Sequence, residues 1–169
     1  MRPLETLVRY KAWADKLFFQ CVSELDAKQL TTKQPIIFGS LIRTLNHSYL
    51  MDFAWKCNLL GERHGLTTRN PVEHPDFRAL RERQEAIDAW FVEYGSALSN
   101  SELEAEIAFE FIGGGKGQMS RADVLLHVVN HTTYHRGHAA DMLYRFNVMP
   151  PATDLSVFLK ETRETDAQV

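Results

Sequence analysis

The sequence predicts an all-α protein, a four-helix bundle with a small β-hairpin before the fourth helix. Two long stretches, residues 4–25 and 77–98, place apolar residues at steps of three and four, which is typical of helices that bury one stripe. Two more, residues 40–61 and 120–146, carry start and stop signals of helices. A short stretch alternates apolar and polar residues and runs into a glycine cluster, as a hairpin does. The 169 residues fit one domain, so residues 1–169 are expected to form a single bundle.

The first half of the chain predicts two helices. Residues 4–25 carry one apolar stripe and predict the first helix, whereas residues 26–39 contain a proline and a glycine and predict a connection. The second helix is expected to begin near Ser40 and to stop at Gly61, because a glycine often follows the last residue of a helix. Residues 61–75 hold glycines and prolines without any period, so they predict a long loop.

The second half predicts two more helices with the hairpin between them. The third helix has the most regular stripe, over residues 77–98. A period of two followed by a glycine cluster predicts a hairpin within residues 104–119. The fourth helix is expected over residues 120–146, beginning at a sequence that resembles a capping box. Residues 157–161 predict a last short turn.

Composition and charge exclude several classes of protein. Apolar residues make up 44% of the chain and charged residues 24%, which is ordinary for a globular domain. A net charge of −3 and the lack of a Lys/Arg stripe argue against a nucleic-acid partner. The 2 cysteines stand in separate segments and exclude a disulfide framework. No secretory signal and no apolar run of spanning length is found, so we expect a cytoplasmic protein without a membrane partner.

Four histidines fall on one face of the predicted fourth helix. At about 100° per residue they occupy a sector of roughly 80°, which apolar residues share, so they point toward the bundle interior. Each buried imidazole needs a partner and cannot be charged cheaply beside the others. A metal ion meets both needs, because it binds neutral imidazoles. These histidines are His127, His131, His135 and His138.

Helical spacing alone leaves the ligand pair open. Residues four apart are neighbours on a helix surface, so the rings of His127 and His131, or of His131 and His135, can reach one ion. His135 and His138 qualify at a spacing of three. Because one helix supplies two ligands comfortably, a third must come from another helix. His47, in the predicted second helix, is the one further histidine on a helix.

Several motifs together identify a family. They are YKAWAD at 10–15, GS at 39–40, TLNH at 44–47, Asp52, Trp55 and HxxNHxxxHRG at 127–137. Over roughly residues 7–146 the sequence thus resembles the DinB (damage-inducible) family, also called the DinB/YfiT-like metalloenzymes. The resemblance implies a divalent metal ion held by His47, His131 and His135. Imidazole ligands suit zinc, nickel, iron and copper alike. We take zinc or nickel as the preferred ion, with iron or manganese as further candidates.

The sequence departs from the family pattern near these histidines. His138 stands where Gln is usual, Tyr134 where a further His is frequent, and Asp15 where Asn is common. His138 is therefore a candidate for a weak additional metal ligand or for contact with a ligand histidine. Asp15 is a candidate for hydrogen bonding near the site, and His127 for contact with a ligand histidine or the substrate. No residue is assigned a catalytic role.

Three imidazoles leave coordination positions open, which is typical of a catalytic metal site. The resemblance implies a thiol-dependent S-transferase or isomerase, in which a low-molecular-weight thiol attacks a small-molecule substrate. Two alternatives remain: a metal-dependent hydrolase, and a non-catalytic, stress-associated bundle that binds a metal or a small ligand. The resemblance also implies a homodimer, and the apolar Trp90 and Val92 lie off the third-helix stripe, where they need cover.

Overall fold

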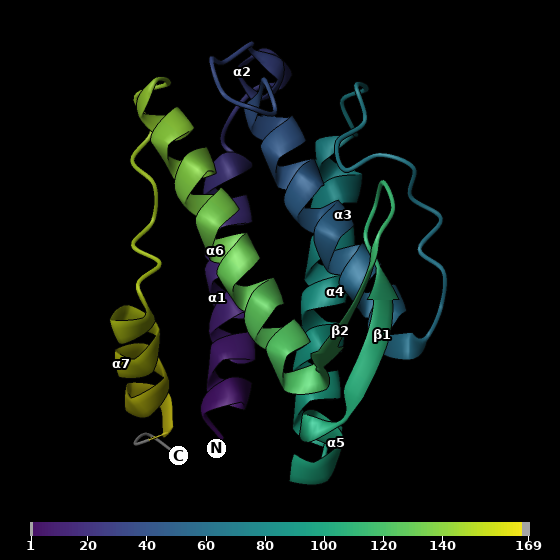
Figure 1. The fold of residues 1–169 in the computed structure, drawn as a ribbon. Helices are drawn as coiled ribbons and strands as arrows, with labels where there is room; N and C mark the ends of the chain where they lie inside the picture. Colours follow the sequence, from purple (N-terminus) through teal and green to yellow (C-terminus); the bar gives the residue numbers. More distant parts are fainter. Residues whose placement is uncertain (1, 167–169) are drawn as a thin grey trace.

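Four long helices form the body of the protein in the computed structural model, which describes residues 2–166 and the side chains of residues 2–164 (Figure 1). α1 packs against α4 and α6, and α3 also packs against both α4 and α6. The prediction of a four-helix bundle is thereby confirmed. The four are α1 (Pro3–Val22), α3 (Leu41–Leu60), α4 (Phe77–Ala97) and α6 (Arg121–Tyr144).

Shorter elements complete the fold. The predicted hairpin is present before α6, with β1 and β2 antiparallel. Three details of the prediction are wrong: the expected connection contains the short α2, the unpredicted short helix α5 precedes β1, and the last turn is a helix of 12 residues, α7. These elements are α2 (Ala27–Thr31), α5 (Asn100–Glu104), β1 (Glu106–Glu110), β2 (Lys116–Ser120) and α7 (Leu155–Asp166). No helix among the described residues is long and apolar enough to span a bilayer.

Capping residues set the boundaries of the long helices. Ser40, Asp76 and Ser120 each precede a helix, and each side-chain oxygen accepts a hydrogen bond from the backbone N–H three residues later. Gly61 ends α3 with a φ of 70°, a left-handed conformation that glycine adopts without strain. The predicted start of this helix near Ser40 and its predicted end at Gly61 are therefore confirmed.

A layer of polar residues divides the apolar core. One apolar cluster includes Val8, Ala14, Trp55, Ile87, Phe91 and Val128. The other includes Phe18, Val22, Leu41, Leu45, Leu80 and Met142. Near the middle of each long helix lie buried polar side chains that we call the polar layer: Lys11, Asp15, Asp52, Gln84, Asp88, Thr132 and Arg136.

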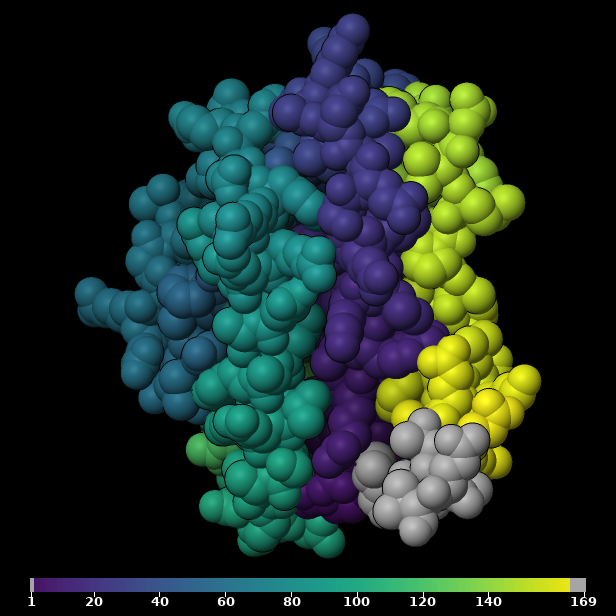
Figure 2. Space-filling view, turned by 180° about the vertical axis from the view of Figure 1, so that it is seen from behind, coloured from purple at the N-terminus to yellow at the C-terminus, as the bar shows by residue number. Residues whose placement is uncertain are grey.

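The C-terminal helix covers one side of α1. Figure 2 shows α1 (purple) between α4 (teal) and the C-terminal segment (yellow). Phe158 of α7 meets the rings of Tyr10 and Trp13, with centroid distances of 6.0 and 5.5 Å. The Tyr10 hydroxyl donates to the Thr153 carbonyl at 2.8 Å, which ties the segment before α7 to the bundle.

Candidate metal centre

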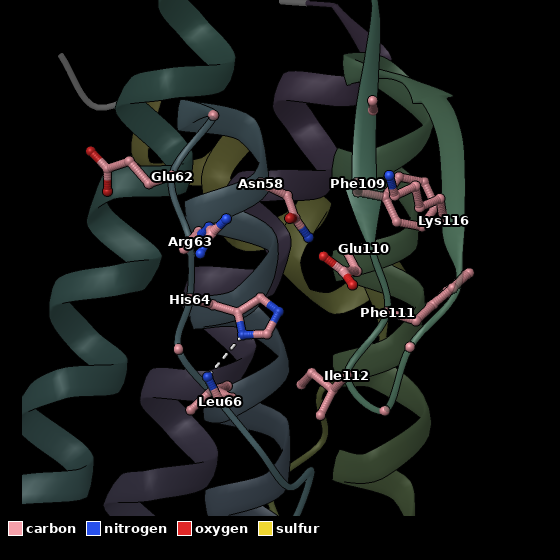
Figure 3. Close-up of a pocket in the computed structure, with 15 residues that line it drawn as sticks. Asn58, Glu62, Arg63, His64, Leu66, Phe109, Glu110, Phe111, Ile112 and Lys116 are labelled. Atoms are coloured by element: carbon pink, nitrogen blue, oxygen red, sulfur yellow. Dashed lines mark hydrogen bonds between the residues drawn. The ribbon is translucent and has the colours of Figure 1, made fainter.

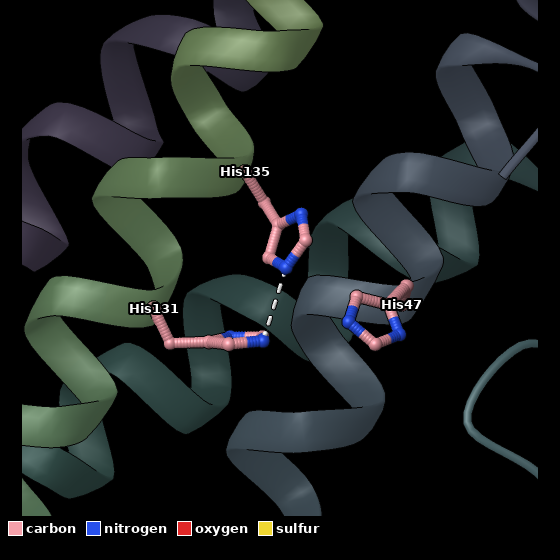
Figure 4. Close-up of side chains that lie close together, drawn as sticks. All are labelled: His47, His131 and His135. Atoms are coloured by element: carbon pink, nitrogen blue, oxygen red, sulfur yellow. Dashed lines mark hydrogen bonds between the residues drawn. The ribbon is translucent and has the colours of Figure 1, made fainter. Parts of the chain in front are cut away.

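Three histidines from two helices converge on one point. His131 and His135 lie one turn apart on α6, and His47 faces them from α3 (Figure 4). One ring nitrogen from each histidine lies within 4.8 Å of the others, an arrangement that can hold a metal ion. Helical spacing left several pairs of histidines open as candidate ligands. The structure brings the pair His131 and His135 together with His47.

The distances and hydrogen bonds of the three rings fit a metal ion. The Nε2 atoms of His131 and His135 are 3.1 Å apart, so one ring can donate to the other. Two nitrogens on one zinc ion at about 2.0–2.1 Å lie roughly 3.3 Å apart in tetrahedral geometry, so the same spacing suits two ligands. His47 Nδ1 donates to the Arg69 carbonyl at 2.8 Å. The neutral His47 ring therefore leaves Nε2 unprotonated, as a ligand must be.

Burial keeps the three rings neutral. It lowers the pKa of His131 to about 3, with further lowering from the neighbouring histidines, chiefly His135. It lowers the pKa of His135 to about 4, and His47 and His138 add to that effect. Burial also lowers the pKa of His47. Because metal ions bind the deprotonated imidazole, the three rings are in the ligand form at neutral pH.

The three histidines line a cavity of about 530 Å³. Most of its wall is apolar and aromatic, formed by Ile37, Phe38, Met51, Trp55, Phe109 and Ile112. Phe38 stacks on His47, with ring centroids 4.1 Å apart. The volume lies within the usual range for a small-molecule site, roughly 300–1,000 Å³. A ligand in this cavity therefore has direct access to the histidines.

The other two candidate histidines lie on different sides of this group. His127 lines the same cavity, and its ring centroid is 5.7 Å from that of His131 and 5.0 Å from that of Trp55. His138 lines a separate cavity of about 420 Å³, with its ring centroid 5.8 Å from that of His135. The structure thus places His127 on the wall of the cavity of the three histidines and His138 on the wall of another cavity.

Asp15 belongs to the polar layer and does not line the cavity of the histidines. Its carboxylate accepts hydrogen bonds from Lys11 Nζ at 3.0 Å and from Arg136 Nη1 at 2.9 Å. The Lys11 ammonium also contacts Asp52, at 2.7 Å, and Asp88. The three carboxylates themselves have the spacing of a cation site, and the ammonium of Lys11 is the cation among them.

The sequence contained a signal for this ionic cluster. Gln84 falls within the otherwise apolar stripe of residues 77–98, and its side-chain amide donates to Asp52 at 3.0 Å and to Asp88 at 3.1 Å. A polar residue on a buried stripe needs partners, so its position predicts a polar network at that height. Periodicity does not reveal which residues supply those partners.

A second cavity, of about 620 Å³, lies between the loop after α3 and the hairpin (Figure 3). Arg63, His64 and Lys116 are among its polar lining, and His64 Nδ1 accepts from the Leu66 backbone N–H at 2.9 Å. This outer cavity shares Asn58 and residues 109–112 with the cavity of the histidines. The strand end therefore forms a wall between the two cavities.

Comparison with known proteins agrees with the fold. The DinB family model matches residues 1–167. Protein DinB of Bacillus subtilis (strain 168) is 25% identical over 166 residues, which cover 95% of this chain and 96% of that protein. A crystal structure of a DinB-like protein from Bacillus cereus matches in fold, with a TM-score of 0.66, 17% identity, and coverage of 85% of this chain and 91% of that one. The chain belongs to the DinB family.

Proposed function

We propose that the protein is an enzyme that depends on a divalent metal ion held by His47, His131 and His135. The observation that carries this proposal is the convergence of three neutral imidazoles, within 4.8 Å of one another, on a cavity of small-molecule size. Three protein ligands leave coordination positions for water or a substrate. The all-nitrogen donor set suits zinc, nickel, iron and copper, and we propose zinc or nickel, with iron or manganese as further candidates.

The reaction that we propose is transfer of a low-molecular-weight thiol to an electrophilic small molecule. A bound divalent ion would supply positive charge that lowers the pKa of a thiol. A carbon–sulfur bond forms, the leaving group departs with its electron pair, and the thiol proton passes to solvent. Phe38 and Trp55 provide apolar walls that exclude water, and the Arg69 carbonyl orients His47 through Nδ1.

Metal analysis of protein purified without an affinity tag tests the ligand set. We expect one divalent ion per chain in the wild type and strong loss in His131→Ala. His138→Ala is the matched control, because His138 lies in a different cavity, and it should keep the ion. Retention of metal by His131→Ala together with loss in His138→Ala would show that the ligands are assigned wrongly.

Cobalt substitution tests whether a thiol binds. Sulfur ligation of Co²⁺ gives an intense charge-transfer absorption that water ligation lacks, so small thiols should change the spectrum of the Co²⁺ protein. His135→Ala should lose this change. A spectrum that no thiol alters would favour a metal-dependent hydrolase or a non-catalytic metal-binding protein. A thiol-dependent change would then call for an assay of turnover with electrophilic substrates.

A homodimer also remains a proposal. Trp90 and Val92 are half-buried within the single chain, and Trp90 stacks on Tyr94 with ring centroids 4.7 Å apart. Much of the cover that these residues need is therefore internal, so the dimer rests on the family resemblance. Light scattering should return twice the chain mass of 19.4 kDa, and a result of 19.4 kDa would exclude the dimer under those conditions.

A further inference from the structure

Arg69 brings a positive charge without a carboxylate partner into the cavity of the three histidines. It lies on the long loop after α3 and lines that cavity. Its guanidinium donates one hydrogen bond, from Nη2 to the Ile112 carbonyl at 3.3 Å. Among the described side chains no Asp or Glu forms an ion pair with it. Because a guanidinium carries five N–H donors, Arg69 keeps most of its hydrogen-bonding capacity for a ligand.

Both ends of Arg69 are held in place. Its backbone carbonyl accepts the hydrogen bond from His47 Nδ1, at 2.8 Å. Its side chain reaches the wall of the hairpin at Ile112, which is itself buried. A group that is already positioned loses less conformational entropy when it binds a ligand. Arg69 is thus an exposed donor that two hydrogen bonds orient close to the candidate metal ligands.

The remaining wall of the cavity limits the kind of ligand that fits. It is mainly apolar, with the aromatic rings of Phe38, Trp55 and Phe109. Glu110 is the other formally charged residue of the lining, and it forms no ion pair with Arg69. Apolar walls around a single cationic donor suit an apolar molecule with one anionic end.

We propose that this cavity binds small organic acids, with the carboxylate on Arg69 and an apolar body among the aromatic side chains. Arginine is well suited to a carboxylate, because its planar fork can form two parallel hydrogen bonds. The assignment of such an acid as the substrate rests on the proposed function, whereas its binding to Arg69 does not. The carboxylate is the recognition group and the rest of the molecule faces the histidines.

The test compares 3-phenylpropionate with 3-phenylpropionamide, two molecules of almost equal size that differ in charge. Ligand-observed NMR titration gives both affinities for the metal-free and the metal-loaded protein. We expect the acid to bind roughly fivefold more tightly than the amide in both forms, because Arg69 is exposed and water screens its attraction for a carboxylate. Arg69→Met should abolish this preference, and Arg69→Lys should retain part of it.

Arg63→Met is the matched control, because Arg63 lines the outer cavity and not the cavity of the histidines. It should leave the preference for the acid unchanged. Arg69→Met keeps the backbone carbonyl that orients His47, so metal content should also stay unchanged in that variant. Equal affinities for acid and amide in the wild type, no binding of either, or an equal loss in Arg63→Met would overturn the proposal.

The two metal states separate this proposal from the proposed function. A preference for the acid that appears only with metal and survives Arg69→Met would mean that the ion binds the carboxylate. This result would overturn the role of Arg69 and support the metal centre. A preference in the metal-free protein that Arg69→Met removes supports the carboxylate site. That result would stand even if metal analysis found no ion on the three histidines.

Discussion

The ammonium of Lys11 lies 2.7 Å from Asp52 Oδ2 in the interior of the bundle, where each of the two side chains is 1% exposed. Asp15 and Asp88 complete its surroundings. Burial lowers the pKa of Lys11, but these carboxylates outweigh it and raise the pKa well above its usual value. The ion cluster joins α1, α3 and α4, and Arg136 adds α6. Its members depend on one another, because a buried charge without a partner is costly.

Lys11→Met should destabilise the fold strongly. The substitution leaves buried carboxylates without their common cation, and breaking a buried ion pair in this way costs about 3–5 kcal/mol. The free energy of unfolding from urea denaturation measures the effect. Lys160→Met is the matched control, since Lys160 pairs with Glu164 at 3.8 Å on an exposed surface. This substitution should hardly change the free energy of unfolding. Equal effects of the two substitutions would contradict the structural importance of the cluster.

Asp88 should make stability depend on pH. Burial raises the pKa of Asp88 to about 7, with Asp15 and Asp52 adding to this against the opposing effect of Lys11. The folded state therefore holds a proton that the unfolded state releases near pH 4. This contribution to stability is full below the unfolded pKa and is lost as the pH rises to about 7.

Asp88→Asn provides the measurement, because the amide cannot titrate. Between pH 5 and pH 7, the free energy of unfolding of the wild type should fall relative to that of Asp88→Asn. The slope of this difference can reach about 1.4 kcal/mol per pH unit. A difference that stays constant over this range would mean that Asp88 does not hold the extra proton.

Tyr10→Phe should weaken the attachment of the C-terminal segment. The Tyr10 hydroxyl donates to the Thr153 carbonyl at 2.8 Å and accepts from Arg136 Nη2 at 2.9 Å. Removing it leaves two polar groups with one partner fewer, at a cost of about 1–3 kcal/mol for buried groups. Thermal unfolding should show a lower Tm, and limited proteolysis should cut faster near residue 153. Tyr134→Phe, at a ring that is 61% exposed, should change neither.

The sequence predicted α1 and α4 from their apolar stripes. It predicted α3 and α6 mainly from start signals at Ser40 and Ser120. Apolar periodicity did not reveal the short helices. Five residues, as in α2 and α5, are too few to display a period of 3.6. Their capping boxes at Asp26 and Ser99 were the available local signals.

The candidate site was predictable only in part. Spacing on one helix placed His131 and His135 side by side, but the distance to His47 depends on how α3 packs against α6. Arg69 gave no signal, since it lies on a loop without any period. Its relation to the histidines arises from the tertiary path of that loop, through the hydrogen bond of its carbonyl to His47.

Gly117→Ala should distort the wall that the two cavities share. Gly117 pairs with Phe109 across the hairpin, and a Cβ at this position would lie 2.3 Å from Phe109 Cζ. The ring packs against Trp55 at a centroid distance of 4.9 Å, so it cannot move freely, and we expect a loss of about 1–3 kcal/mol in urea denaturation. Gly137→Ala is the control: no atom lies within 4 Å of its added Cβ, and alanine favours the helix by up to about 1 kcal/mol. If Gly117→Ala proved as stable as Gly137→Ala, Phe109 would have room to move, and its ring would not be a fixed wall of either cavity.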